Sequence, residues 1–304
     1  MTEAVIRPGS TGHSHGASEI PLQTRSERLR SANASDHVAI DGRDEQWRYL
    51  DALRLAGLDT NILRDASSDL AFEAPTEFTH ELVGAADPLF GTAGLPEDIT
   101  SANAWGAANQ AFKITLNGEA SEAATLKIAD IKHDRAAHII INSKTHSRGT
   151  VIIDHTGDAT LAEVVEIIVG DESELTVVSI QDWNENAVHT SAQFARIGRN
   201  AKLKHIVVSL GGKTVRVTPT AEFTAPGAEV ELLGLYFADA GQHLEHRSYV
   251  DHAVANCKSR VTYKGALQGK GAHTVWVGDV LIRKAAEGTD TYELNRNLLL
   301  TDGA

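Results

Sequence analysis

The segment between positions 243 and 257 is the part of the sequence richest in side chains that bind metals or transfer protons. It contains His243, Glu245, His246, Asp251, His252 and Cys257. Histidine and cysteine are the expected donors to zinc or iron, but no spacing within the segment is a known metal signature. We keep His252 and Cys257 as candidate metal ligands. For Cys257 itself we predict a structural role, as a buried thiol that packs like a small apolar side chain.

A phosphate-binding loop is the other motif to consider. Residues 210–214 (LGGKT) resemble the end of such a loop, but that loop needs a glycine where Val207 stands. It also needs a helix whose N-terminus holds the phosphates, and residues 215–217 (VRV) are typical of a strand. We therefore expect no nucleotide site here, and the sequence offers no catalytic residue.

Charge and composition narrow the class of protein further. The 304-residue chain has a net charge of −13, which argues against a nucleic-acid or anionic-membrane partner. Residues 151–195 contain nine acidic residues and no Lys or Arg, and we interpret them as a solvated acidic face. The single cysteine excludes an internal disulfide and fits a reducing compartment. With neither a signal-peptide core nor a long apolar stretch, a cytoplasmic protein is expected.

The chain divides into three parts by pattern. Residues 1–17 are rich in Gly, Ser and His and are expected to form a disordered arm. Residues 18–110 are expected to be mainly helical, because residues 24–27 (TRSE) resemble a helix start. In the same region Trp47, Leu50, Leu53 and Leu55 have the spacing of one buried helix face.

Residues 111–304 consist of short β-type runs separated by polar turns. Gly or Asn opens a similar turn every 13 to 15 residues, at Gly157, Gly170, Asn184, Gly198, Gly212, Gly227 and Gly241. A short fixed period indicates a stack of similar units, each of which buries its apolar face against its neighbours. Two units, about 28 residues, would make one coil of a β-solenoid. A β-sandwich is the alternative, although its turn intervals are usually less regular. In a solenoid the candidate ligands at 243–257 would fall on different faces.

The last fifty residues carry a specific resemblance. Residues 257–267 (CKSRVTYKGAL), 275–282 (VWVGDVLI) and 289–300 (TDTYELNRNLLL) follow one another as in the SufB/SufD family of iron–sulfur cluster assembly proteins, and its SufD branch in particular. Residues 44–50 (DEQWRYL) resemble the Trp-Arg-Tyr segment near the family's N-terminus, and residues 107–112 (AANQAF) match more weakly.

The resemblance implies a mainly β chain with a right-handed parallel β-helix over residues 111–304. It also implies a non-catalytic scaffold subunit, not an enzyme, which forms a heterodimer with a SufB-like subunit. A SufC-like ATPase joins them, and an iron–sulfur cluster is present only transiently in the complex. The family dimer joins its β-helices near their C-terminal ends. Residues expected near the partner are Val275, Val277, Val280, Ile282, Tyr292, Leu298 and Leu300.

Family members normally continue beyond the Asn-Leu-Leu-Leu segment, with further coils and a C-terminal helical domain that contacts the ATPase. On this basis we expect the present chain to lack the SufC contact, to pair weakly with SufB, and to self-associate through an open solenoid end. The leucines of residues 298–300 are expected to point into the core. Two other classes are considered, a solenoid polysaccharide lyase or hydrolase and a structural solenoid with another partner. Copurification with SufB and SufC would separate them.

Overall fold

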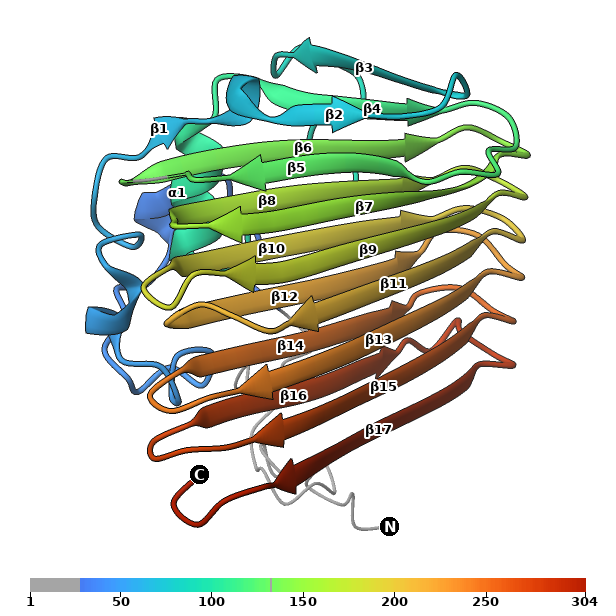
Figure 1. Cartoon of the computed structure of the whole chain (residues 1–304). Helices are drawn as coiled ribbons and strands as arrows, with labels where there is room; N and C mark the ends of the chain where they lie inside the picture. Colours follow the sequence, from blue (N-terminus) through green and yellow to red (C-terminus); the bar gives the residue numbers. More distant parts are fainter. Residues whose placement is uncertain (1–27, 132) are drawn as a thin grey trace, which may run out of the picture.

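Two β-sheets face each other along the length of the molecule in the computed structural model, which describes residues 28–131 and 133–304 (Figure 1). Sheet A contains β1 (Arg64–Asp65), β3 (Phe78–Val83), β4 (Ala111–Leu116), β6 (Arg135–Ser143), β8 (Thr160–Val169), β10 (Val188–Ile197), β12 (Thr214–Phe223), β14 (His243–His252) and β16 (His273–Ile282). Sheet B contains β2 (Ala71–Glu73), β5 (Ala124–Ala129), β7 (Arg148–Gly157), β9 (Glu174–Trp183), β11 (Lys202–Ser209), β13 (Glu229–Ala238), β15 (Lys258–Leu267) and β17 (Asp290–Leu299). From β4 onward, consecutive strands alternate between the two sheets.

This arrangement is a parallel β-solenoid of about seven turns, and it confirms the predicted fold. Strand pairing shows the coil length directly, since Thr160 of β8 lies beside Val188 of β10, 28 residues later. Nearer the C-terminus the coils lengthen, and Lys258 of β15 lies beside Asp290 of β17. The sandwich alternative is wrong because neighbouring strands from β4 to β17 are parallel.

The predicted turn residues lie at the ends of strands. Gly212 has a φ of +95°, which glycine adopts at little cost. Gly170 is required for lack of space, because a Cβ there would lie 2.6 Å from the carbonyl oxygen of Ser143 in the preceding coil. The recurrence of small residues therefore reflects close stacking of successive corners as well as backbone conformation.

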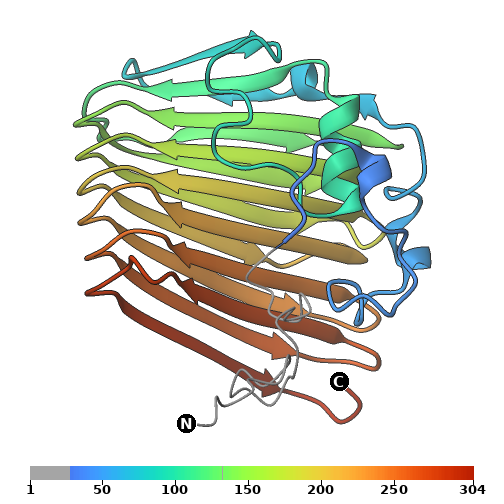
Figure 2. The ribbon, with the colours of Figure 1, turned by 180° about the vertical axis from the view of Figure 1, so that it is seen from behind.

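The solenoid interior is filled by alternate residues of each strand. In β9, Leu175 and Val177 point inward and are buried, while Thr176 and Val178 between them are only partly covered. Strands β8, β10 and β14 of sheet A are buried on both faces instead. The cover over sheet A is the N-terminal segment, whose α1 (Ile99–Ala107) crosses β6, β8 and β10 (Figure 2).

The expectation of a mainly helical N-terminal region is wrong for the residues described. Between residues 28 and 110 the structure has one α-helix, α1, and three short 3₁₀ turns at Ala34–Asp36, Ala52–Leu55 and Ser67–Asp69. Trp47, Leu50 and Leu55 are buried, but Leu53 is 89% exposed. The first three pack with residues of sheet A such as Val164 and Phe194. Their spacing therefore comes from a series of turns that packs on the sheet, and not from one face of a helix. The expected arm at residues 1–17 and the helix start at 24–27 lie outside the described residues.

Candidate functional site

Strand β14 separates the metal-binding side chains that the sequence placed together. His243 and Glu245 lie on the outer face of sheet A, whereas His246 and His252 lie on the inner face, as expected for a solenoid. Asp251 is on the outer face and pairs with Arg283, with the nearest N–O distance at 2.6 Å. The segment is therefore not one site.

On the outer face, Glu245 is the centre of a buried ion cluster. It accepts hydrogen bonds from Arg216 at 3.2 Å, from Arg247 at 2.5 Å and from a ring nitrogen of His243 at 3.1 Å. Burial alone would raise the pKa of Glu245, but the hydrogen bond from His243 and the two guanidinium charges hold it below its usual range. Arg216 also binds Asp98, the N-cap of α1, at 2.7 Å. This cluster fastens the N-terminal segment to the solenoid.

A cavity of about 560 Å³ lies beside the cluster, between the N-terminal segment and sheet A. Its lining includes Arg216, Arg247, Trp47 and Phe194. Both guanidinium groups already contact Glu245, so their charge is largely neutralised by the protein itself. The cavity is therefore lined by apolar and charged side chains, without a strong excess of positive charge.

The two candidate metal ligands, His252 and Cys257, have different hydrogen-bond partners and share none. The Nε2 atom of His252 hydrogen-bonds the Ser259 hydroxyl at 2.9 Å. The Cys257 thiol is 1% exposed and lies 3.5 Å from two backbone carbonyl oxygens, as a weak donor. Burial raises the pKa of the Cys257 thiol, which disfavours the thiolate that a metal needs. Their contacts therefore give no support to a shared metal site.

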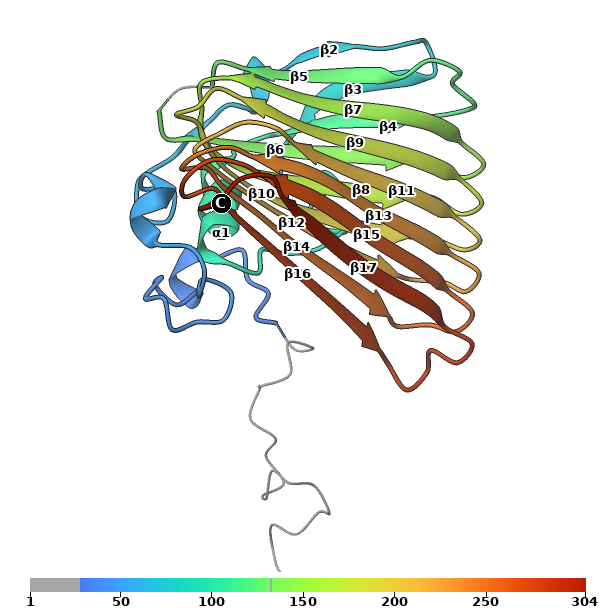
Figure 3. The same ribbon diagram turned by 60° about the horizontal axis from the view of Figure 1, so that its bottom comes forward.

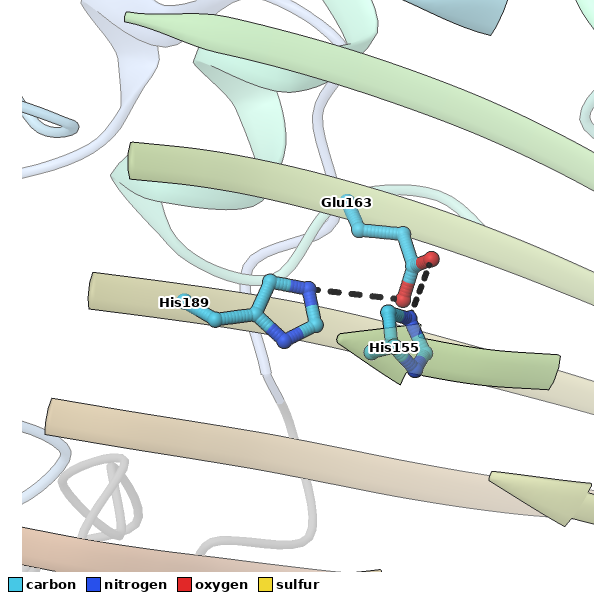
Figure 4. A group of neighbouring side chains, drawn as sticks. All are labelled: His155, Glu163 and His189. Carbon is cyan, nitrogen blue, oxygen red and sulfur yellow. Dashed lines mark hydrogen bonds and ion pairs between the residues drawn. The ribbon is translucent and has the colours of Figure 1, made fainter. Parts of the chain in front are cut away.

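A different group of metal-binding side chains does converge, inside the solenoid. His155 of β7, Glu163 of β8 and His189 of β10 point toward one another (Figure 4), and each is at most 1% exposed. One oxygen of Glu163 lies 3.0 Å from Nε2 of His155, and the other lies 3.6 Å from Nε2 of His189. Within the described part of the chain, this is the one group of three or more such side chains whose ligand atoms lie within 4.8 Å of one another.

The pKa values of Glu163 and His189 differ strongly from their ordinary values in water. Burial alone would raise the pKa of Glu163, but the neighbouring histidines and the Ser191 hydroxyl lower it to about 2. Burial lowers the pKa of His189 to about 3. Near neutral pH the interior therefore holds a carboxylate next to a neutral imidazole.

This group was not expected from the sequence, and the interpretation of Glu163 and Glu166 as part of a solvated acidic face is wrong, since both are at most 1% exposed. Glu166 faces outward but is covered by the N-terminal segment, where its carboxylate accepts hydrogen bonds from the backbone of Gly91 and Ala93. A signal for Glu163 was available, because it has the same strand phase as the apolar residues Val165 and Ile167.

Two other histidines of the interior predict acid sensitivity. Burial lowers the pKa of His205 to about 4, and burial is also the main cause that lowers the pKa of His246 to about 4. An unfolded chain protonates these groups near pH 6.5, so between about pH 6.5 and 4 the unfolded state binds more protons and the folded state loses stability as pH falls. We expect the free energy of unfolding in urea to decrease through this window. His205→Gln should reduce the slope by about one proton, and an unchanged slope would contradict the assignment.

Strands β16 and β17 lie at the C-terminal end of the solenoid (Figure 3). Each is the last strand of its sheet among the residues that the structure describes, so one edge of each strand is unpaired there. Of the residues expected near a partner, Ile282, Tyr292, Leu298 and Leu300 are exposed, with exposed fractions between 46% and 60%. Val277 and Val280 are half-buried, and Val275 is buried.

The expectation that the leucines at 298–300 point into the core is wrong for Leu298, which faces outward from β17, and none of the three is buried, since each is at least 46% exposed. Leu299 has the inward strand phase, yet it is 64% exposed since no described strand lies beyond β17 to cover it. The end of the solenoid thus presents an apolar surface together with unpaired backbone groups.

No helix in the described ranges has the length and apolar character needed to cross a membrane. The family profile described as "SUF system FeS cluster assembly, SufBD core domain" matches residues 109–304, which include the solenoid from β4 to β17.

Curated relatives agree with that match. The chain is 45% identical over 273 residues to an iron–sulfur cluster assembly SufBD family protein of Mycobacterium leprae (strain TN), covering 86% of this chain and 70% of the relative. It is 45% identical over 275 residues to a SufBD family protein of Mycobacterium tuberculosis (strain ATCC 25618 / H37Rv), covering 86% and 69%. A SufBD family protein of Staphylococcus haemolyticus (strain JCSC1435) is 24% identical over 134 residues, or 44% and 29% of the two chains. With this solenoid, this profile match and these relatives, the chain belongs to the SufBD family of iron–sulfur cluster assembly proteins.

Proposed function

We propose that the chain is a non-catalytic scaffold subunit of the SufD type, which pairs with a SufB-like subunit in the cytoplasm and works together with a SufC-like ATPase. The observation that carries the proposal is the match of the SufBD core profile to residues 109–304, which form the parallel solenoid. Exposed apolar side chains on β16 and β17 add a surface where a sheet edge can pair with another chain. The iron–sulfur cluster is cargo in this scheme, held transiently in the complex.

The chemistry of the other candidate groups supports a structural role. The ion cluster around Glu245 is saturated by its own partners, and the Cys257 thiol is buried with a raised pKa. Neither arrangement presents a nucleophile or a general base to a substrate. The edge is therefore the surface that best fits a scaffold function.

Coexpression of the tagged chain with a SufB-like and a SufC-like protein tests the proposal. We expect the SufB-like partner to be retained on affinity capture in less than stoichiometric amounts, and the SufC-like ATPase to be retained only through it. Retention of neither, with the chain folded by circular dichroism, would contradict the scaffold role and favour a solenoid with another partner.

Substitution at the edge tests its location. Leu298→Lys combined with Leu300→Lys places two charges on the surface where the partner would bury them, so we expect at least about a tenfold loss of SufB retention. Leu235→Lys is the matched control, since Leu235 is 53% exposed on β13 in the middle of the same sheet. Equal retention by the edge variant and the control would show that the partner docks elsewhere.

A further inference from the structure

We propose that His155, Glu163 and His189 form a binding site for one divalent transition-metal ion of the Zn²⁺ or Fe²⁺ type inside the solenoid. The three side chains come from three strands, and their ligand atoms lie within 4.8 Å of one another (Figure 4). Two imidazole nitrogens and one carboxylate are a common donor set for these ions. The inference is independent of the proposed scaffold role.

The protonation of His189 follows from its neighbours. The Trp183 indole N–H can only donate, and it lies 2.9 Å from the side-chain oxygen of Gln181, which fixes the orientation of that amide. The same oxygen lies 2.7 Å from Nδ1 of His189, and an amide oxygen can only accept. The Trp183 N–H also lies 3.2 Å from Nδ1 of His189, but the contact with the amide oxygen is shorter and favours a hydrogen on Nδ1 and a lone pair on Nε2.

The same reasoning applies to His155. Its Nδ1 atom lies 2.8 Å from the backbone carbonyl oxygen of Ile180, which can only accept a hydrogen bond. The side-chain amide nitrogen of Gln181 also lies 3.2 Å from Nδ1 of His155, but the carbonyl contact is shorter and favours a hydrogen on Nδ1. The Nε2 atom of this ring faces Glu163 at 3.0 Å, a hydrogen-bond distance, and a cation bound there would take the place of the hydrogen between the two atoms.

Both rings thus turn their Nε2 atoms toward one carboxylate in a site shielded from water. Nε2 of His189 has no hydrogen-bond partner although the residue is 0% exposed, and at 3.6 Å it is too far from Glu163 for a hydrogen bond. The unpaired buried nitrogen is costly without a partner, and the Glu163 carboxylate, which already accepts from His155 and from the Ser191 hydroxyl at 2.5 Å, would gain a cation as a further partner. Metal-bound histidines characteristically donate their other ring N–H to a carbonyl or carboxylate, and both histidines here donate to a carbonyl-type oxygen.

The spacing of the donors suits a small ion. Metal–ligand bonds of 2.0–2.1 Å at tetrahedral angles place donor atoms roughly 3.3 Å apart. The two nitrogen–oxygen distances, 3.0 Å and 3.6 Å, bracket that separation. Three protein donors leave a position for water or another ligand, and nitrogen donors disfavour Mg²⁺ and Ca²⁺, which prefer oxygen. The competing occupant is a proton shared between His155 and Glu163.

Metal content of the full chain tests the site. Because the ligands are buried, the ion should enter during folding, so the chain is expressed in medium supplemented with Zn²⁺ or Co²⁺ and desalted before elemental analysis. We expect about one ion per chain and, for Co²⁺, the visible absorption of a low-coordinate complex. Glu163→Gln and His189→Gln should each lower metal content at least about tenfold. His205→Gln is the matched control and should retain the ion, because His205 is another buried interior histidine outside the group.

A second measurement covers variants that fold poorly. Unfolding the wild-type chain in a strong chelator and refolding it without metal should lower its melting temperature, and refolding with Zn²⁺ should recover it, whereas Mg²⁺ should not. A wild-type chain that carries no metal after growth in either ion, and whose melting temperature does not respond to chelator or Zn²⁺, would overturn the proposal in favour of the shared proton. So would metal retained at the wild-type level by both variants.

Discussion

Replacing Arg216 with methionine is expected to destabilise the protein by about 3–5 kcal/mol, because it leaves two buried carboxylates without their shared cation. Arg216 is 2% exposed, and its guanidinium group lies 2.7 Å from Asp98 and 3.2 Å from Glu245. The same group lies 4.0 Å from the centre of the Trp47 ring, and this contact is lost too. Urea unfolding of the two proteins at neutral pH measures the difference.

Arg148→Ala is the control for this prediction. Arg148 pairs with Glu174 at 2.6 Å, but its side chain is 62% exposed, so the loss should be about 0–1 kcal/mol. Because Asp98 caps α1, Arg216→Met should also increase hydrogen exchange in α1 more than in the central strands. Equal stability of the two variants would show that the ion cluster does not hold the N-terminal segment in place.

Replacing Gly234 with alanine is expected to cost about 3 kcal/mol through overpacking. Gly234 faces the interior from β13, and a Cβ at this position would lie 1.9 Å from an atom of the Tyr263 ring. Tyr263 is 0% exposed, with the rings of His246 and Trp276 as neighbours, so it has little room to move. Thermal and urea unfolding should both report the loss.

Gly84→Ala is the control, because no atom lies within 4 Å of the Cβ that it would add, and its stability should change by no more than about 0.5 kcal/mol. A double variant tests the cause. Tyr263→Ala removes the ring that Gly234 accommodates, so Gly234→Ala should cost much less in that background. A full cost in both backgrounds would mean that the strain arises from the backbone.

The solenoid could be predicted because its determinants are local and periodic. Each corner repeats the same steric demand, as at Gly170, so small residues recur at the coil period whatever the outer surface contains. The N-terminal segment has no such repeat. Trp47 and Leu50 are buried in one cluster with Val164 and Phe194 of sheet A, which come more than a hundred positions later in the chain. Apolar spacing alone cannot distinguish that contact from a helix face.

The candidate site was less predictable for a related reason. Spacing along the chain identified residues 243–257, yet alternation within β14 sends neighbours to opposite faces of sheet A. His155 and His189 are 34 positions apart and meet only because two coils stack in register. Inward strand phase would have marked Glu163, but its partners depend on the register between coils, which the sequence pattern does not specify.

Hydrogen–deuterium exchange of the chain with and without a SufB-like subunit tests the central claim most directly. If the free edge is the pairing surface, amides of β17 (Asp290–Leu299) should become protected on binding, because their exchange is otherwise limited only by local opening. Strands β2 and β3, at the opposite end of the solenoid, should be unchanged. Binding that protects β2 and β3 while β16 and β17 exchange as in the free chain would contradict the account.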